Sequence, residues 1–283
     1  MEKSELKELK LFAANLRKNI LTAVYSGKSG HPGGSLSIAD TLTYLYNKVM
    51  NIDPKNPNDP DRDRLVLSKG HTSPALYGIL AELGYFPKEE LTKFRHIGSF
   101  LQGHPDMKGV PGVDMSTGSL GQGLSAACGM AISAKVTGSD FKVYAILGDG
   151  EIQEGQIWEA AMFAAAKNLD NLVAIIDNND LQIDGRLRDV NSPYPINEKF
   201  EAFGWHVIDA VAHDFDSLAS AFAEVEENRG KGKPIAIVQC SIKGKCVSYM
   251  EDRAEWHGNA PNKEQYEQGI SELDQLIKEI EEE

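Results

Sequence analysis

VYAILGDGE, residues 143–151, is an apolar run that ends in an acidic residue between two glycines. A continuous run of Val, Ala, Ile and Leu, without polar alternation, is typical of a strand buried on both faces of a parallel sheet. Ligands of open α/β sheets bind beyond the carboxyl ends of the strands. Asp149 stands at such an end, and Gly148 and Gly150 would let a ligand approach the backbone. Taken alone, a GDG sequence is also typical of a tight turn.

Further apolar runs of strand length alternate with stretches of helical character. The predicted strands are 64–68, 143–147, 172–176, 205–209 and 235–239. The predicted helices are 5–25, 74–83, 120–136, 154–168 and 215–228. This alternation predicts an α/β fold with a doubly wound, mostly parallel sheet and helices on both faces. Because no linker divides the chain, we expect a single domain over residues 1–283.

Composition narrows the class of protein before any site is considered. The chain has 283 residues, of which 41% are hydrophobic and 25% charged, so it is neither collagen-like nor disordered nor rich in disulfides. Three cysteines without metal-ligand spacing fit reduced thiols. The charged opening is no signal peptide, and no apolar run reaches the ~18 residues of a membrane span. We therefore expect a cytoplasmic protein.

The chain is acidic, with a formal net charge of −13. This charge repels polyphosphate chains and anionic lipid, so we expect no nonspecific nucleic-acid or membrane-surface binding. Residues 263–283 hold eight acidic and two basic side chains, which is typical of a solvated terminal helix.

A second predicted strand also ends in polar residues, at a position that matches Asp149. The run LVAII is followed by Asp177-Asn178-Asn179, and Asp149 and Asn179 are 30 residues apart, about the length of one βαβ unit. Their side chains should therefore emerge at the same sheet edge. A carboxylate and an amide oxygen suit a hard cation such as Mg²⁺. In so acidic a protein, a diphosphate ligand would need such a bridging cation.

Other segments near these strand ends also carry polar groups. Backbone N–H groups in STGSLGQG, residues 116–123, could hold phosphate oxygens at the start of a helix, although glycine and serine commonly cap helices without a ligand. Glu151 and Glu154 open the next predicted helix, where negative charge is favourable. For Glu151 we favour that structural role.

Four of the seven histidines lie beside glycine in loop-like contexts. They are His31, His71, His104 and His257. Imidazoles can bind sugar hydroxyls and move protons near neutral pH. The remaining histidines are interpreted as structural; they are His96, His206 and His213.

Together these segments resemble the thiamine-diphosphate-binding domain of transketolase. The likeness begins at Arg17, covers nearly the whole chain, and rests on SGHPGGSLS (29–37), LSKGH (67–71), GHPD (103–106), TGSLGQG (117–123), LGDGEIQEG (147–155), DNNDLQIDG (177–185), KGK (243–245) and WHG (256–258). Several ordered motifs make the likeness specific. It departs from the family at Cys246, where glycine is more common, which puts the backbone there in question.

The resemblance implies a cofactor site with assigned residues. Mg²⁺, or Ca²⁺ or Mn²⁺ in its place, would be held by Asp149, Asn179 and the backbone carbonyl of Leu181. The residues expected to contact thiamine diphosphate are His71, Gly118, Ser119, Leu120, Gly150, Asn179, Lys243 and His257. The residues expected to bind substrate and assist proton transfer are His31, His104 and His257. Glu154 would belong to a contact network near a subunit interface.

The implied activity is transfer of a two-carbon glycolaldehyde unit from a ketose phosphate to an aldose phosphate, as in the pentose phosphate pathway. The chemistry belongs to the cofactor. No segment beyond His257 is long enough for the family's pyrimidine-binding and C-terminal domains. We therefore expect a separate C-terminal subunit, which supplies the pyrimidine-binding glutamate, in an α2β2 assembly.

Three alternative functions remain open on the sequence. The α subunit of a thiamine-dependent 2-oxo acid dehydrogenase also needs a second chain, but the SGHPGG, GHPD and WHG motifs argue against it. A 1-deoxyxylulose-5-phosphate synthase shares several motifs, and the WHG and KGK context favours transketolase over it. A noncatalytic phosphate-binding regulator would have no need of all four loop histidines.

Overall fold

The fold is built on a five-stranded sheet in which every pair of neighbouring strands is parallel. The computed structural model describes residues 1–283. The strand order is β1-β2-β3-β7-β6. The strands are β1 (Arg64–Leu67), β2 (Val143–Gly148), β3 (Leu172–Asn178), β6 (His206–Val211) and β7 (Ile235–Cys240). The predicted α/β fold and parallel sheet are confirmed, with each strand close to its predicted bounds.

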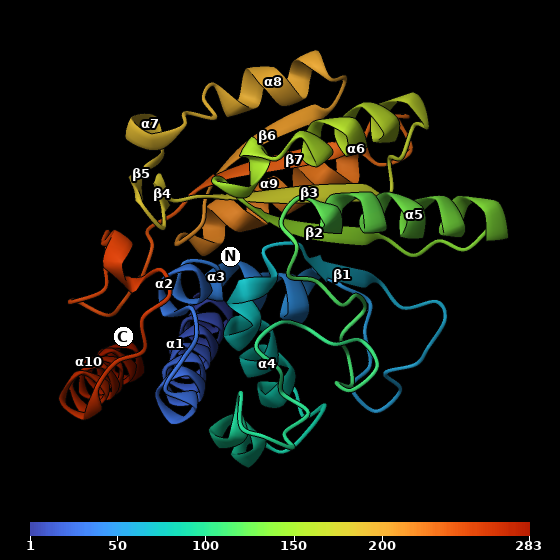
Figure 1. Ribbon diagram of the computed structural model, residues 1–283. Helices are drawn as coiled ribbons and strands as arrows, with labels where there is room; N and C mark the ends of the chain where they lie inside the picture. The colour runs from blue at the N-terminus through green and yellow to red at the C-terminus, as the bar shows by residue number, and fades with distance from the viewer.

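Successive side chains of the central strands enter two different cores. Tyr144 and Ile146 of β2 belong to the larger cluster, and Ala145 and Leu147 to the smaller one. Helices α1 (Lys3–Gly27), α3 (Ala39–Tyr44), α4 (Ser73–Glu82) and α9 (Phe215–Asn228) cover the first face (Figure 1). Helices α5 (Gln122–Thr137), α6 (Gly155–Ala166) and α8 (Ile196–Ala202) cover the second. Both faces of β2 are therefore buried from solvent, which explains its uninterrupted apolar sequence.

The long helices lie close to their predicted positions. Their bounds are α1 (Lys3–Gly27), α4 (Ser73–Glu82), α5 (Gln122–Thr137), α6 (Gly155–Ala166), α9 (Phe215–Asn228) and α10 (Lys263–Glu282). None of them is long and apolar enough to cross a membrane.

The acidic helix α10 is more than a solvated tail. Its N-terminus carries a capping box between Asn262 and Gln265. It lies beside α1 (Figure 1), where Leu273 is buried and Tyr266 stacks on Tyr25 at 4.2 Å between ring centroids. One face of the helix is therefore packed, and part of its negative charge is paired with α1, where Lys18 contacts Asp274 and Lys10 contacts Glu283.

The shortest elements have no counterpart among the predicted helices and strands. They are α2 (Pro32–Leu36), α3 (Ala39–Tyr44), the π-helical turn Leu45–Val49, the hairpin strands β4 (Leu181–Gln182) and β5 (Gly185–Arg186), α7 (Leu187–Val190) and α8 (Ile196–Ala202). Elements of two to seven residues contain too few positions to establish a hydrophobic period. Tertiary contacts decide their structure.

Strand register brings the polar strand ends together. Gly148 of β2 lies opposite Asp177 of β3, and Asn178 of β3 lies opposite Cys240 of β7. All strands point the same way, so the segments that follow β1, β2, β3 and β7 leave one edge of the sheet. This edge carries the candidate site.

Candidate functional site

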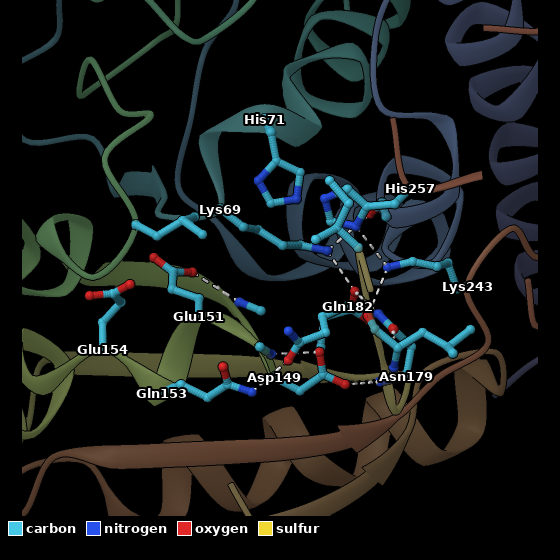
Figure 2. A pocket seen from close by; sticks show the side chains of 17 residues that line it. Lys69, His71, Asp149, Glu151, Gln153, Glu154, Asn179, Gln182, Lys243 and His257 are labelled. Atoms are coloured by element: carbon cyan, nitrogen blue, oxygen red, sulfur yellow. Dashed lines mark hydrogen bonds and ion pairs between the residues drawn. The ribbon is translucent and has the colours of Figure 1, made fainter. Parts of the chain in front are cut away.

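A cavity of about 200 Å³ lies beyond the carboxyl ends of the strands (Figure 2). Most of the residues predicted to bind the cofactor or a metal line it: His71, Leu120, Asp149, Gly150, Asn179, Leu181, Lys243 and His257. They come from six separate segments of the chain. Only the sheet topology brings them together.

Asp149 is held rigidly at the cavity floor. Its Oδ2 accepts hydrogen bonds from the backbone N–H groups of Asn179 and Asp180, both at 2.7 Å, while Oδ1 accepts only from Gly150 at 2.8 Å. Each carboxylate oxygen has two lone pairs, so Oδ1 keeps one for a further partner. Burial, together with the charge of Asp177, raises the pKa of Asp149 to about 7. A cation beside Oδ1 would stabilise the ionised carboxylate and lower this pKa again.

Asn179 and Leu181 present two more oxygens to the cavity. The side-chain Nδ2 of Asn179 donates to Asp177 Oδ2 at 3.0 Å, and its Oδ1 accepts from the Leu181 N–H at 3.2 Å. The Leu181 carbonyl accepts from Lys243 Nζ at 2.9 Å. One carboxylate and two neutral oxygens match the hard-cation chemistry of Mg²⁺, which retains positions for phosphate oxygens. The chain contains no group of three or more His, Cys, Asp or Glu side chains placed to hold a metal by themselves.

The two glycines beside Asp149 are not required by the backbone. A Cβ at Gly148 would meet its nearest neighbours at 3.7 Å, and one at Gly150 would meet Gln182 at 3.4 Å, which are ordinary contacts. Neither residue is among the glycines with positive φ. Both line the cavity. Their missing side chains therefore leave room for a ligand. The backbone turns at Asp149 and Gly150, as a GDG sequence alone would suggest, but that turn does not itself require glycine.

Lys243 carries a positive charge into the cavity without an anionic hydrogen-bond partner. Its ammonium group donates to the Leu181 carbonyl and to Nδ1 of His257 at 3.3 Å. Burial lowers its pKa to about 8, although Asp149 opposes the shift. A buried ammonium bonded only to neutral groups is ready to bind an anion such as a phosphate oxygen.

Two histidines, His71 and His257, line the cavity, and His31 packs against both of them. The ring centroids of His31, His71 and His257 are separated by 4.9 to 5.5 Å. Burial lowers the pKa of His31 to about 4 and that of His257 to about 3, with help from the charges of Arg95 and Lys243 respectively. All three are therefore neutral at pH 7, because burial also lowers the pKa of His71.

The contact with Lys243 fixes the tautomer of the neutral His257 ring. Because an ammonium group only donates, the Nδ1 that accepts from Lys243 carries no proton, and Nε2 holds the ring hydrogen. His257 is thus an available N–H donor within the cavity.

The segment Gly118–Leu120 forms an exposed rim. Ser119 and Leu120 are exposed, and Leu120 lines the cavity. At Gly118, φ is 149° and a Cβ would lie 3.1 Å from the His104 ring, so glycine permits this approach. The structure therefore brings His104 to this rim, although neither His104 nor Ser119 lines the cavity itself.

Glu151 and Glu154 differ from the expected helix-opening pair. Helix α6 begins at Gly155, with Glu154 at its N-cap, and Glu151 lies in a preceding 3₁₀ turn. The buried Glu151 carboxylate accepts from the Ser68 hydroxyl and from the backbone N–H groups of Gly121 and Gly148. The expected role of Glu151 at a helix start is therefore wrong: its carboxylate ties three segments together, and it also lines the cavity.

Two buried charges of the site were missed by sequence reasoning. Lys69 and Asp177 form an ion pair of 2.5 Å at the cavity wall, and both are almost inaccessible to solvent. Lys69 follows strand β1 and Asp177 ends strand β3, so their position at strand ends was the available signal.

The Cys246 position has the backbone for which glycine is best suited. Its φ is 69°, in the left-handed region that costs a non-glycine residue roughly 1–2 kcal/mol. Its N–H donates to Glu251 at 2.8 Å, which helps to hold the turn. The departure from the family pattern is therefore accommodated without a change of fold.

The histidines interpreted as structural have partners outside the cavity. His213 Nδ1 donates to Asp40 at 2.7 Å and its Nε2 accepts from the Ile242 N–H. His206 contacts Glu224, and His96 contacts the Ser26 carbonyl.

Comparison with known proteins assigns the chain to a family. Residues 9–273 match the family model described as transketolase, thiamine diphosphate binding domain. The chain belongs to this family. The assignment confirms the predicted transketolase N-terminal domain.

Curated relatives include separate transketolase subunits of nearly the same length. A 6-deoxy-6-sulfo-D-fructose transketolase subunit from Clostridium sp. (strain MSTE9) is 46% identical over 259 residues, which cover 92% of this chain and 94% of that protein. An apulose-4-phosphate transketolase subunit from Phocaeicola vulgatus is 40% identical over 279 residues, covering 99% and 98%.

Solved transketolases share the fold but are longer. The transketolase from Leishmania mexicana superposes with a TM-score of 0.84 at 29% identity, covering 97% of this chain and 46% of that one. Thus the chain spans almost all of its subunit-type relatives and less than half of the chain of this solved transketolase.

Proposed function

We propose that this chain is the cofactor-binding subunit of a two-chain transketolase, transferring a two-carbon ketol unit from a ketose phosphate to an aldose phosphate. The observation that carries the proposal is the cavity in which Asp149, Asn179 and Leu181 present oxygens beside the ammonium of Lys243. This arrangement suits a cation and a diphosphate bound together.

The residues present fit magnesium-bound thiamine diphosphate. Asp149 Oδ1, Asn179 Oδ1 and the Leu181 carbonyl would hold the cation. Gly150 and Lys243, with Gly118, Ser119 and Leu120 at the rim, would contact the cofactor. When bound, the cofactor supplies the nucleophilic carbon that takes up the ketol unit. The protein positions it and excludes water.

The histidines would bind and orient the sugar. His257 offers its Nε2–H inside the cavity, His31 lies against it, and His104 stands at the rim. Neutral imidazoles donate and accept hydrogen bonds with hydroxyl groups without adding charge. They can also transfer a proton between a substrate hydroxyl and a neighbouring acceptor.

A second chain would complete the site. The relatives matched over nearly their whole length are named as transketolase subunits. In this proposal the partner supplies the glutamate for the aminopyrimidine of the cofactor and most contacts to the sugar phosphate. An assembly of two copies of each chain would place two such sites at subunit boundaries.

Substrate choice separates this proposal from its enzymatic rivals. Both a 2-oxo acid dehydrogenase and a 1-deoxyxylulose-5-phosphate synthase start from a 2-oxo acid such as pyruvate. The complex of this chain with its partner should transfer a ketol unit from a ketose phosphate and leave pyruvate unchanged. Release of CO₂ from pyruvate would refute the proposal.

The same assay tests the cofactor and metal. Activity should disappear when thiamine diphosphate is omitted or the metal is chelated, and it should return when both are restored. Activity that persists without either would contradict the assigned site. A regulator would show no turnover under any of these conditions.

A further inference from the structure

We infer that Asp177 is a positioning residue, which sets the orientation of the Asn179 amide so that its oxygen, and not its nitrogen, faces the cation. The inference rests on the proposed cofactor site and adds a residue to it. An Asn side chain has an oxygen and an NH₂ group at nearly equivalent positions. Only its surroundings decide which of them faces a ligand.

Asp177 can determine this orientation because it only accepts hydrogen bonds. It is fully buried at the end of β3, and its Oδ2 accepts from Asn179 Nδ2 at 3.0 Å. If the Asn179 amide were turned over, two oxygens would face each other without a proton between them. The hydrogen bond at the amide oxygen favours the same orientation, because Oδ1 accepts from the Leu181 N–H.

Asp177 is itself held by three other donors. Ser37 donates to its Oδ2 at 2.6 Å, Lys69 donates to the same oxygen at 2.5 Å, and the Ser241 hydroxyl donates to Oδ1. With Asn179, three donors converge on Oδ2 and one reaches Oδ1. Oδ2, the oxygen beside Asn179, has no lone pair left for a cation, and Lys69 neutralises the charge of the carboxylate. Asp177 therefore acts on the metal through Asn179.

This network also links segments that are distant in the sequence. Lys69 Nζ donates to the Gly34 carbonyl at 2.9 Å as well as to Asp177. Gly34 lies in the short helix that follows His31, and Lys69 precedes His71. Asp177 thus connects the amide of a proposed metal ligand to the segments that carry His31 and His71.

Removing the carboxylate alone would leave Lys69 as an unpaired buried charge, which by itself destabilises a protein. The test therefore uses two double variants that both remove the ion pair. Asp177→Asn/Lys69→Met keeps an oxygen for the Asn179 amide, because the new NH₂ can face the Ser241 hydroxyl. Asp177→Leu/Lys69→Met has a similar volume and no acceptor.

The measurement is Mn²⁺ binding, followed by electron paramagnetic resonance of the free ion, in the two-chain complex at saturating thiamine diphosphate. The leucine variant should bind Mn²⁺ about 10–100-fold more weakly than the asparagine variant, as is typical when a partner of a metal ligand is lost. Turnover at saturating Mn²⁺ should differ much less between the two. If Asp177 were purely structural, the leucine variant would lose thermal stability, but the two variants would not differ in Mn²⁺ affinity.

Equal Mn²⁺ affinities of the two double variants would overturn the inference and leave the proposed function standing. Absence of Mn²⁺ binding by the wild-type complex would overturn both. If the leucine variant does not fold, Asp177→Ser/Lys69→Met takes its place, because the shorter hydroxyl cannot reach Asn179; the same outcomes then decide.

Discussion

The floor and the rim of the cavity are built in different ways. On the floor, Asp149 and Asn179 are buried, and other groups of the same chain hold their side chains in place by hydrogen bonds. We include in the rim Ile183, which lies between β4 and β5 and also lines the cavity. At this rim, Leu120 is 36% exposed and Ile183 is 65% exposed. The floor is thus complete within this chain, whereas the rim leaves apolar surface uncovered. This difference is what half of a shared active site requires.

The largest effect should follow from removing the charge of the floor. In Asp149→Asn, the remaining oxygen should keep the two N–H groups that bind Oδ2, which turns the NH₂ group toward the cation. We expect cofactor-dependent activity of the complex to fall more than about 100-fold, beyond the loss typical of a partner of a metal ligand. Titration with Mg²⁺ at saturating thiamine diphosphate measures it.

Asp140→Ala is the matched control for this change, since Asp140 is exposed and pairs with Arg229 far from the cavity. Unchanged metal dependence in Asp149→Asn would show that the cation is not held at this floor.

The next effect should come from the histidine that donates into the cavity. His257→Ala should lower kcat/KM about 100-fold, at the lower end of what general acid–base groups contribute. Steady-state rates of ketol transfer by the complex measure this. His206→Ala serves as the control, because His206 lies at the opposite end of the sheet and contacts Glu224. Equal rates for the two variants would remove His257 from the mechanism.

Loss of the cavity ammonium should mainly affect affinity for the cofactor. Lys243→Met keeps most of the side-chain volume and removes a charge-assisted hydrogen bond of about 1.5–3 kcal/mol, so the Kd of thiamine diphosphate should rise roughly 10–100-fold. Lys245→Met, at a partly exposed ion pair with Glu251, should leave this Kd unchanged. Isothermal titration calorimetry of thiamine diphosphate into each variant complex measures the two Kd values. Equal values would contradict an anion-binding role for Lys243.

The smallest effect is expected at the rim. Ile183→Ser should weaken association with the partner chain by about tenfold, a typical cost for an apolar contact within an interface. The free energy of unfolding of the isolated chain should change by less than about 0.5 kcal/mol, since the side chain is exposed. Val136→Ser, at an 80% exposed position of α5, is the control. Equal partner affinity of both variants would show that the rim does not face the partner.

The sequence was sufficient to predict the floor because it follows from a regular pattern. Continuous apolar runs defined the strands, and one βαβ unit between Asp149 and Asn179 placed both residues at one edge. The Leu181 carbonyl came only from the resemblance, since a backbone oxygen leaves no mark on the residue type. The short hairpin that positions Leu181 has no hydrophobic period.

The support behind the floor could not be predicted from local patterns. Asp177 collects donors from Ser37, Lys69 and Ser241, which lie far apart along the chain and meet only after the sheet has formed. Glu151 likewise joins three loops, whereas its neighbours in sequence indicated a helix start. Such hydrogen bonds depend on tertiary structure.

The central claim is that this chain provides one half of an active site. The most direct test is to titrate the purified chain with its purified partner chain, in saturating thiamine diphosphate and Mg²⁺, while ketol transfer from a ketose phosphate is followed. We predict no activity for either chain alone and a rise that ends at equal amounts of the two. Full activity of this chain alone would contradict the account.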